Sequence, residues 1–199
     1  FLGFIFSSCL TYAADEAIPD PFAQMRANQN PAAASTAGVS LAPAQPAPIV
    51  IPEPPSFEAQ SWVLMDYYSG RVITEKNSQE RIWPASLTKM MTSYVIGMEL
   101  KAGRLHMDDD VVITEEAWSK NYNDSSKMFI EVGKTIKVGD LVKGIIIQSG
   151  NDACVAMAEF ICGSEAAFVE KMNARAKGLG MNDTTFVNCC GLDVDGHMT

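Results

Sequence analysis

Residues 84–97 read Pro84-Ala-Ser-Leu-Thr-Lys-Met-Met-Thr-Ser-Tyr-Val-Ile-Gly97, and this stretch decides how the fold is interpreted. Its apolar side chains recur at helical spacing, and a proline suits the first turn of a helix. The pattern predicts a helix from Pro84 to about Lys101. On that helix Ser86 and Lys89 lie one turn apart on the same face.

Ser86 and Lys89 are therefore candidate catalytic residues. A serine hydroxyl becomes a nucleophile when a base lies within reach, and a neutral lysine amine can be that base. An isolated Ser-x-x-Lys is weak evidence, because in many helices the serine is a cap and the lysine is solvated. A second motif, Ser149-Gly150-Asn151, follows at a predicted break between helices. Ser-x-x-Lys followed by Ser-x-Asn is typical of serine acyl-transfer enzymes that react with penicillins.

The segments around these motifs predict an α+β fold. Residues 61–77 contain two β-prone runs separated by Tyr68-Ser69-Gly70, which indicates a hairpin. The first run is apolar on both faces, so we expect this strand pair inside a sheet covered by helices.

Three helices are expected in the second half of the chain. Residues 140–148 are ambiguous, because the three isoleucines at 145–147 could form a strand; we favour a helix, since Asp140 can cap it and Gly150 can end it. Asn151 or Asp152 is expected to cap a helix over residues 153–162. Ser164 is expected to cap another that runs to about residue 177.

The composition fits one globular domain with additional unstructured length. The chain has 199 residues, of which 47% are hydrophobic and 20% are charged. A net charge of −9 argues against nucleic acid as a partner, because few cations are present to neutralise phosphates.

The N-terminal quarter of the chain predicts export. Residues 1–13 resemble the apolar part of a secretory signal whose start is missing, and they are too few to span a membrane. Residues 14–56 are rich in proline and alanine, which is typical of a disordered linker. We expect the folded domain to occupy residues 57–199.

Cysteine and histidine, which often bind metals in proteins, are few in this chain, and the sequence predicts no metal site and no cofactor. Their spacing matches neither a redox Cys-x-x-Cys nor a zinc motif. Cys154 and Cys162 lie in an apolar helical stretch and are interpreted as buried small hydrophobic residues. The cysteines and histidines that follow the expected signal are Cys154, Cys162, Cys189, Cys190, His106 and His197.

Three segments, residues 84–97, 148–158 and 191–196, closely resemble low-molecular-mass penicillin-binding proteins of the D-alanyl-D-alanine carboxypeptidase type. The resemblance extends from about Phe57 to His197. It implies a β-lactamase/DD-peptidase-like domain, in which helices flank an antiparallel sheet and form a helical subdomain. It also implies a periplasmic protein attached to the outer surface of the inner membrane through a later C-terminal segment.

The resemblance implies a role for each motif residue. Ser86 would attack the carbonyl between two terminal D-alanines of a peptidoglycan stem peptide, and Lys89 would accept its proton. Ser149 would relay a proton to the leaving amine, while Asn151 and Gly150 would bind the substrate. β-Lactam antibiotics would be covalent inhibitors that react with the same serine.

Two departures from the family pattern stand out. The third family motif, Lys-Thr-Gly, is absent, because Gly133-Lys134-Thr135 precedes Ser149 and continues with Ile136. We therefore expect a domain truncated at its C-terminal side and inactive as it stands, and we interpret Lys134 and Thr135 as surface residues. The second departure is the pair at 189–190, where a histidine or another polar residue is common in relatives.

Three other functions would share part of this motif pattern. A β-lactamase would usually carry Glu-x-x-Leu-Asn after Ser-x-Asn, and residues 152–199 contain no such motif. A murein DD-endopeptidase of the same family would use the same residues, so the sequence does not separate it from a carboxypeptidase. A non-catalytic peptidoglycan-binding relative predicts substitutions within the two motifs, and Ser86, Lys89, Ser149 and Asn151 are all intact.

Overall fold

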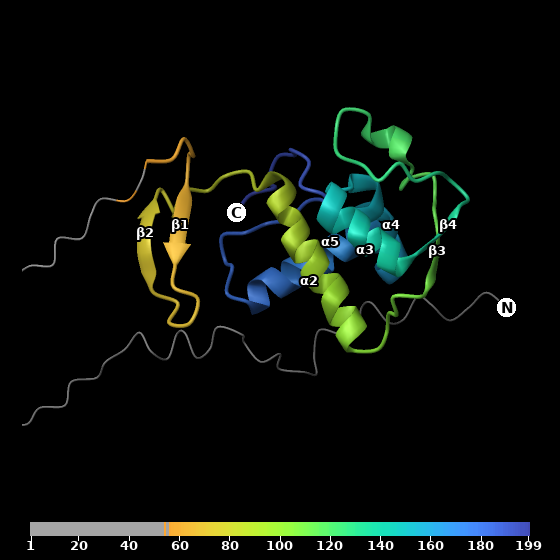
Figure 1. Cartoon of the computed structure of the whole chain (residues 1–199), viewed down its shortest axis with the longest axis horizontal. Helices are drawn as coiled ribbons and strands as arrows, with labels where there is room; N and C mark the ends of the chain where they lie inside the picture. Colours follow the sequence, from red (N-terminus) through yellow and green to blue (C-terminus); the bar gives the residue numbers. More distant parts are fainter. Residues whose placement is uncertain (1–53, 55) are drawn as a thin grey trace, which may run out of the picture. The chain divides into compact units, whose positions relative to one another are not determined.

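The computed structural model of the chain describes residue 54 and residues 56–199 (Figure 1). The expected signal, residues 1–13, and nearly all of the expected linker, residues 14–56, lie outside the described residues. The described chain divides after Glu80 into two units, a hairpin unit and a helical unit.

The hairpin unit confirms the predicted strand pair. Strand β1, Trp62–Met65, pairs with β2, Val72–Lys76, in an antiparallel two-stranded sheet. Asp66 shapes the turn, because its Oδ1 accepts a hydrogen bond of 2.8 Å from the backbone N–H of Ser69. Leu64 and Met65 remain about half exposed. The helical cover expected for these strands is not found within this unit.

The helical unit begins with the predicted helix around Ser86. A 3₁₀ turn, η2 at Ala85–Leu87, leads directly into α2, Thr88–Lys101. The expected helix is therefore confirmed, with a tighter first turn. Met91, Val95 and Ile96 lie on the buried face of α2.

Helix α4, Asn151–Cys162, forms the centre of this unit. Its residues 151–158 are all buried, because α3, Val138–Gln148, and α5, Glu165–Gly178, both pack against it (Figure 1). A helix that is apolar around its whole circumference is buried in this way. Helix α2 contacts all three of the others. Helices combined with small antiparallel sheets confirm the α+β class.

Two of the predicted helix caps are wrong. Asp140 lies in the first turn of α3 and does not cap it, because the helix already begins at Val138. Helix α3 ends at Ser149, which adopts the left-handed conformation in place of the expected stop at Gly150.

Neither Asn151 nor Asp152 caps α4, because the helix already begins at Asn151, directly after Gly150. Asp152 binds the preceding loop. Its Oδ1 accepts a hydrogen bond of 2.8 Å from the N–H of Met128, and its Oδ2 accepts one of 3.2 Å from the N–H of Ile130. The carboxylate thus holds the preceding loop on the start of α4. The cap at Ser164 is confirmed, since its hydroxyl accepts a bond of 3.2 Å from the N–H of Ala167.

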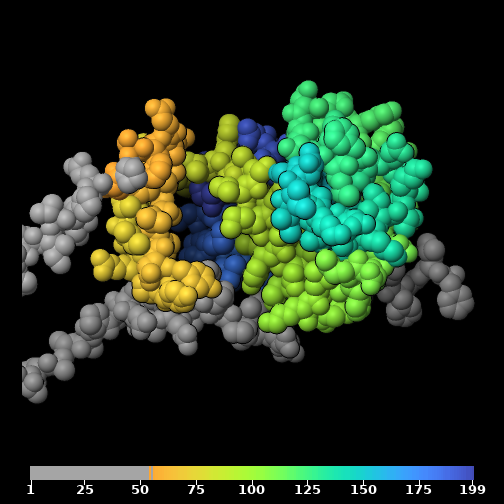
Figure 2. Space-filling view, in the orientation of Figure 1, coloured from red at the N-terminus to blue at the C-terminus, as the bar shows by residue number. Residues whose placement is uncertain are grey.

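A small sheet and a 3₁₀ turn complete the helical unit. Strand β3, Asp110–Val112, pairs with β4, Thr135–Lys137, and η3 covers Ser119–Tyr122. Figure 2 shows α3 beside the segment that precedes it on the face in view. Lys134 and Thr135 are exposed, as predicted. Within the described part of the chain, every helix is too short or too polar to cross a membrane.

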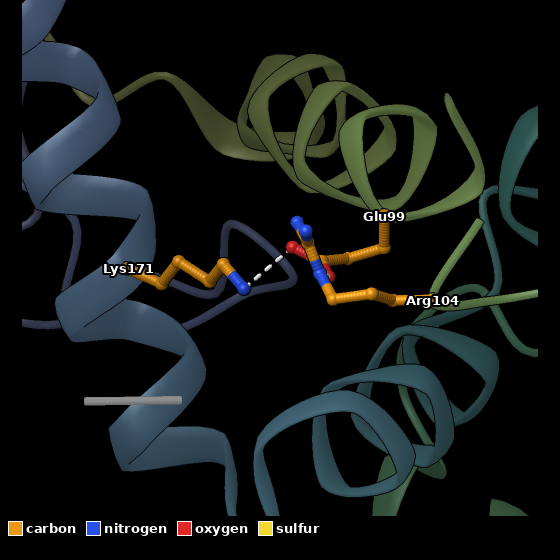
Figure 3. Close-up of polar contacts among 3 residues, drawn as sticks. All are labelled: Glu99, Arg104 and Lys171. Atoms are coloured by element: carbon orange, nitrogen blue, oxygen red, sulfur yellow. Dashed lines mark hydrogen bonds and ion pairs between the residues drawn. The ribbon is translucent and has the colours of Figure 1, made fainter. Parts of the chain in front are cut away.

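An ion cluster centred on the buried Glu99 joins α2 to α5 (Figure 3). Glu99 is 4% exposed, and its carboxylate lies 2.7 Å from Arg104 Nε and 2.5 Å from Lys171 Nζ. Burial alone would raise the pKa of Glu99, but the hydrogen bonds from Arg104 and Lys171 outweigh it and lower the pKa.

His197 joins the C-terminal segment to α2. Its Nδ1 accepts hydrogen bonds from the backbone N–H groups of Val187 (3.1 Å) and Asn188 (3.4 Å). The proton of the neutral ring is therefore on Nε2, which donates to Thr88 Oγ1 at 2.7 Å. Burial lowers the pKa of His197 and favours this neutral form.

We expect Glu99→Gln to destabilise the protein by on the order of 3 kcal/mol, because it removes the buried carboxylate that pairs with both Lys171 and Arg104. Urea unfolding of the full-length protein measures the loss. Glu170→Gln, at an exposed position beside Lys171, is the control and should change stability by less than about 0.5 kcal/mol. Equal effects of the two substitutions would contradict a structural role for the cluster.

We expect His197 to make stability dependent on pH just below its ordinary pKa of about 6.5. Between the lowered folded pKa and that value the unfolded chain binds more protons, so the free energy of unfolding rises with pH and falls as the solution is acidified. Unfolding measured over this range should show a weaker slope in His197→Asn. Exposed His106→Asn should retain the wild-type slope, and a wild-type slope in both variants would rule out the assignment to His197.

Candidate active site

Ser86 lies at the entrance to α2 and is exposed, whereas Lys89 one turn later is 6% exposed. Lys89 Nζ donates a hydrogen bond of 3.3 Å to Ser86 Oγ. The structure therefore brings the predicted pair together, with an accessible hydroxyl and a buried amine.

Lys89 is held from its other side by a backbone group. Its Nζ donates a hydrogen bond of 2.6 Å to the carbonyl oxygen of Cys190. Thr92, one turn further along α2, donates a bond of 2.7 Å to the carbonyl of Cys189. Two successive carbonyls thus fix α2 and orient the lysine. The sequence could not indicate this, because a backbone acceptor has no residue signature.

Ser149 joins the pair from a different element. Its Oγ lies 3.2 Å from Ser86 Oγ. Ser149 ends α3 with φ 56° and ψ 36°, in the left-handed region that serine rarely adopts. Ala85, directly before Ser86, also has a positive φ of 46°. Such strained positions cluster at functional sites, where each costs about 1–3 kcal/mol.

Asn151 and Gly150 form the start of α4. Asn151 is 3% exposed, and its Nδ2 donates a hydrogen bond of 3.0 Å to Ser125 Oγ. A Cβ on Gly150 would lie 3.2 Å from the backbone nitrogen of Met128, so the close approach of that loop explains the glycine. Sequence reasoning missed Ser125, which reaches the site from the loop after η3.

The loop over residues 188–192 closes the site against the turn at Ser86. Asn188 shapes this loop, because its Oδ1 accepts hydrogen bonds from the N–H groups of Gly191 (2.6 Å), Cys190 (3.1 Å) and Leu192 (3.1 Å). Gly191 has φ 86°, and a Cβ there would lie 1.8 Å from the carbonyl oxygen of Ala85. Only glycine permits this contact between the two backbones.

The Cys190 thiol lies near Lys89 and close to the sulfurs of Cys154 and Cys189. Hydrogen bonds with Cys154 and Cys189, together with the charge of Lys89, lower the pKa of Cys190. Burial raises the pKa of Cys154. Cys154 is fully buried, as predicted, whereas Cys162 is only partly buried.

One group of side chains in the described part of the chain could hold a metal ion. The ligand atoms of Glu165, Cys189 and Cys190 all lie within 4.8 Å of one another. The sequence predicts no metal site, and it gives no sign of this group because Glu165 is distant from the cysteines along the chain.

Comparisons with known proteins agree with this geometry. A family model described as D-alanyl-D-alanine carboxypeptidase matches residues 49–199. The chain is 47% identical over 150 residues to D-alanyl-D-alanine carboxypeptidase DacC of Escherichia coli, covering 74% of this chain and 38% of the relative. It is 30% identical over 139 residues to a D-alanyl-D-alanine endopeptidase of Pseudomonas aeruginosa, covering 70% of this chain and 43% of that relative.

A solved structure is similar as well. Penicillin binding protein 5 from Haemophilus influenzae superimposes with a TM-score of 0.72 at 48% sequence identity, covering 74% of this chain and 43% of the other. This chain spans about two fifths of the length of these relatives. The expected DD-peptidase fold is thus confirmed, and the chain belongs to the D-alanyl-D-alanine carboxypeptidase family.

Proposed function

We propose that the full-length protein is a serine-type D-alanyl-D-alanine carboxypeptidase that removes the terminal D-alanine from peptidoglycan stem pentapeptides. One observation carries the proposal: Ser86 Oγ lies 3.3 Å from Lys89 Nζ and 3.2 Å from Ser149 Oγ. A nucleophile, a base and a second proton carrier are thereby within reach of one another.

In the first half of the reaction Ser86 Oγ attacks the carbonyl carbon of the penultimate D-alanine. The hydroxyl proton passes to the neutral amine of Lys89, whose position is fixed by the Cys190 carbonyl. The C–N bond then breaks, and Ser149 relays to the amine of the departing D-alanine the proton that Lys89 had accepted, so Lys89 is neutral again and Ser149 keeps its hydroxyl. The substrate remains bound to Ser86 as an ester.

In the second half water hydrolyses this ester and frees Ser86. Asn151 and Gly150 are assigned to substrate binding, because they border Ser149 at the start of α4. β-Lactams, whose amide resembles the D-alanyl-D-alanine end, form the same ester and are covalent inhibitors. Because peptidoglycan lies outside the cytoplasmic membrane, the proposed activity implies a periplasmic protein; attachment to the outer surface of the inner membrane is part of the proposal.

A murein DD-endopeptidase is the second candidate, because it would use the same three groups on a cross-linked peptide. Sequence similarity favours the carboxypeptidase, since identity is 47% to the carboxypeptidase from Escherichia coli and 30% to the endopeptidase from Pseudomonas aeruginosa. Release of free D-alanine from a pentapeptide, compared with cleavage of a cross-linked dimer, decides between them.

We expect a fluorescent penicillin to label the full-length protein covalently at Ser86, because the amine of Lys89 lies beside this exposed hydroxyl. Peptide mapping by mass spectrometry locates the adduct, and D-alanine release measures turnover. Ser86→Ala should abolish both. Ser93→Ala, two turns later on the same helix, is the matched control and should retain them. An adduct on another residue, or labelling of Ser86→Ala, excludes the proposed mechanism.

We expect Lys89→Arg to slow acylation by about 10²–10⁴-fold, because arginine keeps the charge but cannot give up its proton in a protein. Stopped-flow acylation measures the rate, and near-ultraviolet circular dichroism checks the fold. Lys101→Arg, at the exposed end of α2, should acylate at the wild-type rate. If arginine does not fit the buried site, Lys89→Met tests the same step. A folded Lys89 variant within about threefold of wild type would rule out proton transfer to Lys89.

A further inference from the structure

The cysteine pair at 189–190 has no part in the proposed reaction, yet its backbone carbonyls position Lys89 and Thr92. The side chains of the pair point to a different chemistry. The two sulfurs lie 3.6 Å apart, and both residues are at most 2% exposed. Glu165, the first residue of α5, places a carboxylate oxygen within 4.8 Å of both sulfurs.

This spacing fits two sulfurs bound to one metal ion. Two thiolates on a tetrahedral Zn²⁺ at about 2.3 Å lie about 3.8 Å apart. A carboxylate is a normal third ligand, and three protein ligands leave one position open for water. Glu165 is only half-buried, whereas both cysteines are buried, so the group is open to solvent on the Glu165 side.

A disulfide fits the pair less well. The Cα atoms of consecutive residues are about 3.8 Å apart across a trans peptide, whereas disulfides usually need about 4.4–6.8 Å between Cα atoms. The strain favours the dithiol, which is the form that binds soft cations.

We propose that Glu165, Cys189 and Cys190 bind one thiophilic divalent cation of the Zn²⁺ class, and that the bound cation slows acylation of Ser86. Both sulfurs bind the cation as thiolates, so a thiol that still carries its proton releases it to solvent. The effect on acylation rests on the proposed function, whereas the cation-binding site does not.

The effect on acylation follows from the shared backbone. The carbonyl oxygens that hold Lys89 and Thr92 belong to the residues whose sulfurs bind the ion. Glu165 Oε1 also accepts a hydrogen bond of 2.9 Å from the N–H of Cys189, and this bond weakens when the carboxylate turns to the cation. A small movement of the Cys190 carbonyl displaces Lys89 from Ser86, and misplacement of a catalytic group by about 1 Å can cost about 10²-fold in rate.

Binding is tested first with Cd²⁺, whose bonds to thiolates give a charge-transfer band in the ultraviolet. The full-length protein should bind one Cd²⁺ with this band. Cys189→Ser should lose at least about half of its intensity, and Glu165→Gln should weaken the affinity about 10–100-fold. Cys162→Ser, at a thiol outside the group, should match the wild type. Absence of the band, or an undiminished band in Cys189→Ser, overturns the site.

X-ray absorption on the Zn²⁺-loaded wild-type protein needs no variant and covers the case in which the substitutions impair folding. Two sulfur neighbours at about 2.3 Å support the site, and a shell of oxygen and nitrogen alone overturns it. A disulfide between Cys189 and Cys190 found by peptide mapping of the native protein, with no Cd²⁺ band, would also overturn it.

Acylation by penicillin is then compared with and without Zn²⁺ in each variant. Zn²⁺ should slow the wild type and Cys162→Ser at least about tenfold, and Glu165→Gln much less. Full binding without slowing would overturn the inhibitory clause and leave the site standing. If the protein acylates under no condition, the proposed function fails, while the Cd²⁺ and absorption experiments still decide whether the cation binds.

Discussion

The arrangement of the site depends on the hydrogen bond from Lys89 Nζ to the Cys190 carbonyl. A buried lysine needs partners for its donors, and this bond of 2.6 Å joins residues that are 101 positions apart in sequence. Without it the amine would have only the longer contact with Ser86. The acceptor is a backbone group, so its position is set by the path of the loop and not by the side chain at 190.

Close backbone packing supports that bond. Gly191 lies so near Ala85 that no side chain is tolerated, and Asn188 holds the loop in the required shape. The turn before Ser86 carries strain, since Ala85 has a positive φ. The energetic cost of this strain is offset by hydrogen bonds that join the segment over residues 189–197 to α2, from Thr92 to the Cys189 carbonyl and from His197 to Thr88. Strain of this kind keeps the hydroxyl exposed at the end of a helix that is otherwise packed.

Local spacing made part of this site predictable. Ser86 and Lys89 face the same way on any helix, and Ser149 and Asn151 follow at a helix break that apolar patterning indicates. The wrong cap at Asp152 has a tertiary cause, because its carboxylate accepts hydrogen bonds from the amides of Met128 and Ile130 in the preceding loop as well as from that of Ala153. The three-residue strands β3 and β4 were missed because such short elements give no periodic signal. Backbone acceptors and the approach of Glu165 to distant cysteines appear only in the folded chain.

Cys190 connects all of these features because its main chain and its side chain face different groups. Its carbonyl accepts from Lys89, while its thiol donates a hydrogen bond of 3.4 Å to the carbonyl of Asn151. One residue therefore touches both motifs on which the proposed chemistry depends. A ligand bound to that sulfur competes with the bond to Asn151 and moves the peptide that holds Lys89. A change at the thiol thus reaches Ser86 through two hydrogen bonds, from Lys89 to the Cys190 carbonyl and from Lys89 to Ser86. No ligand needs to occupy the space beside Ser86.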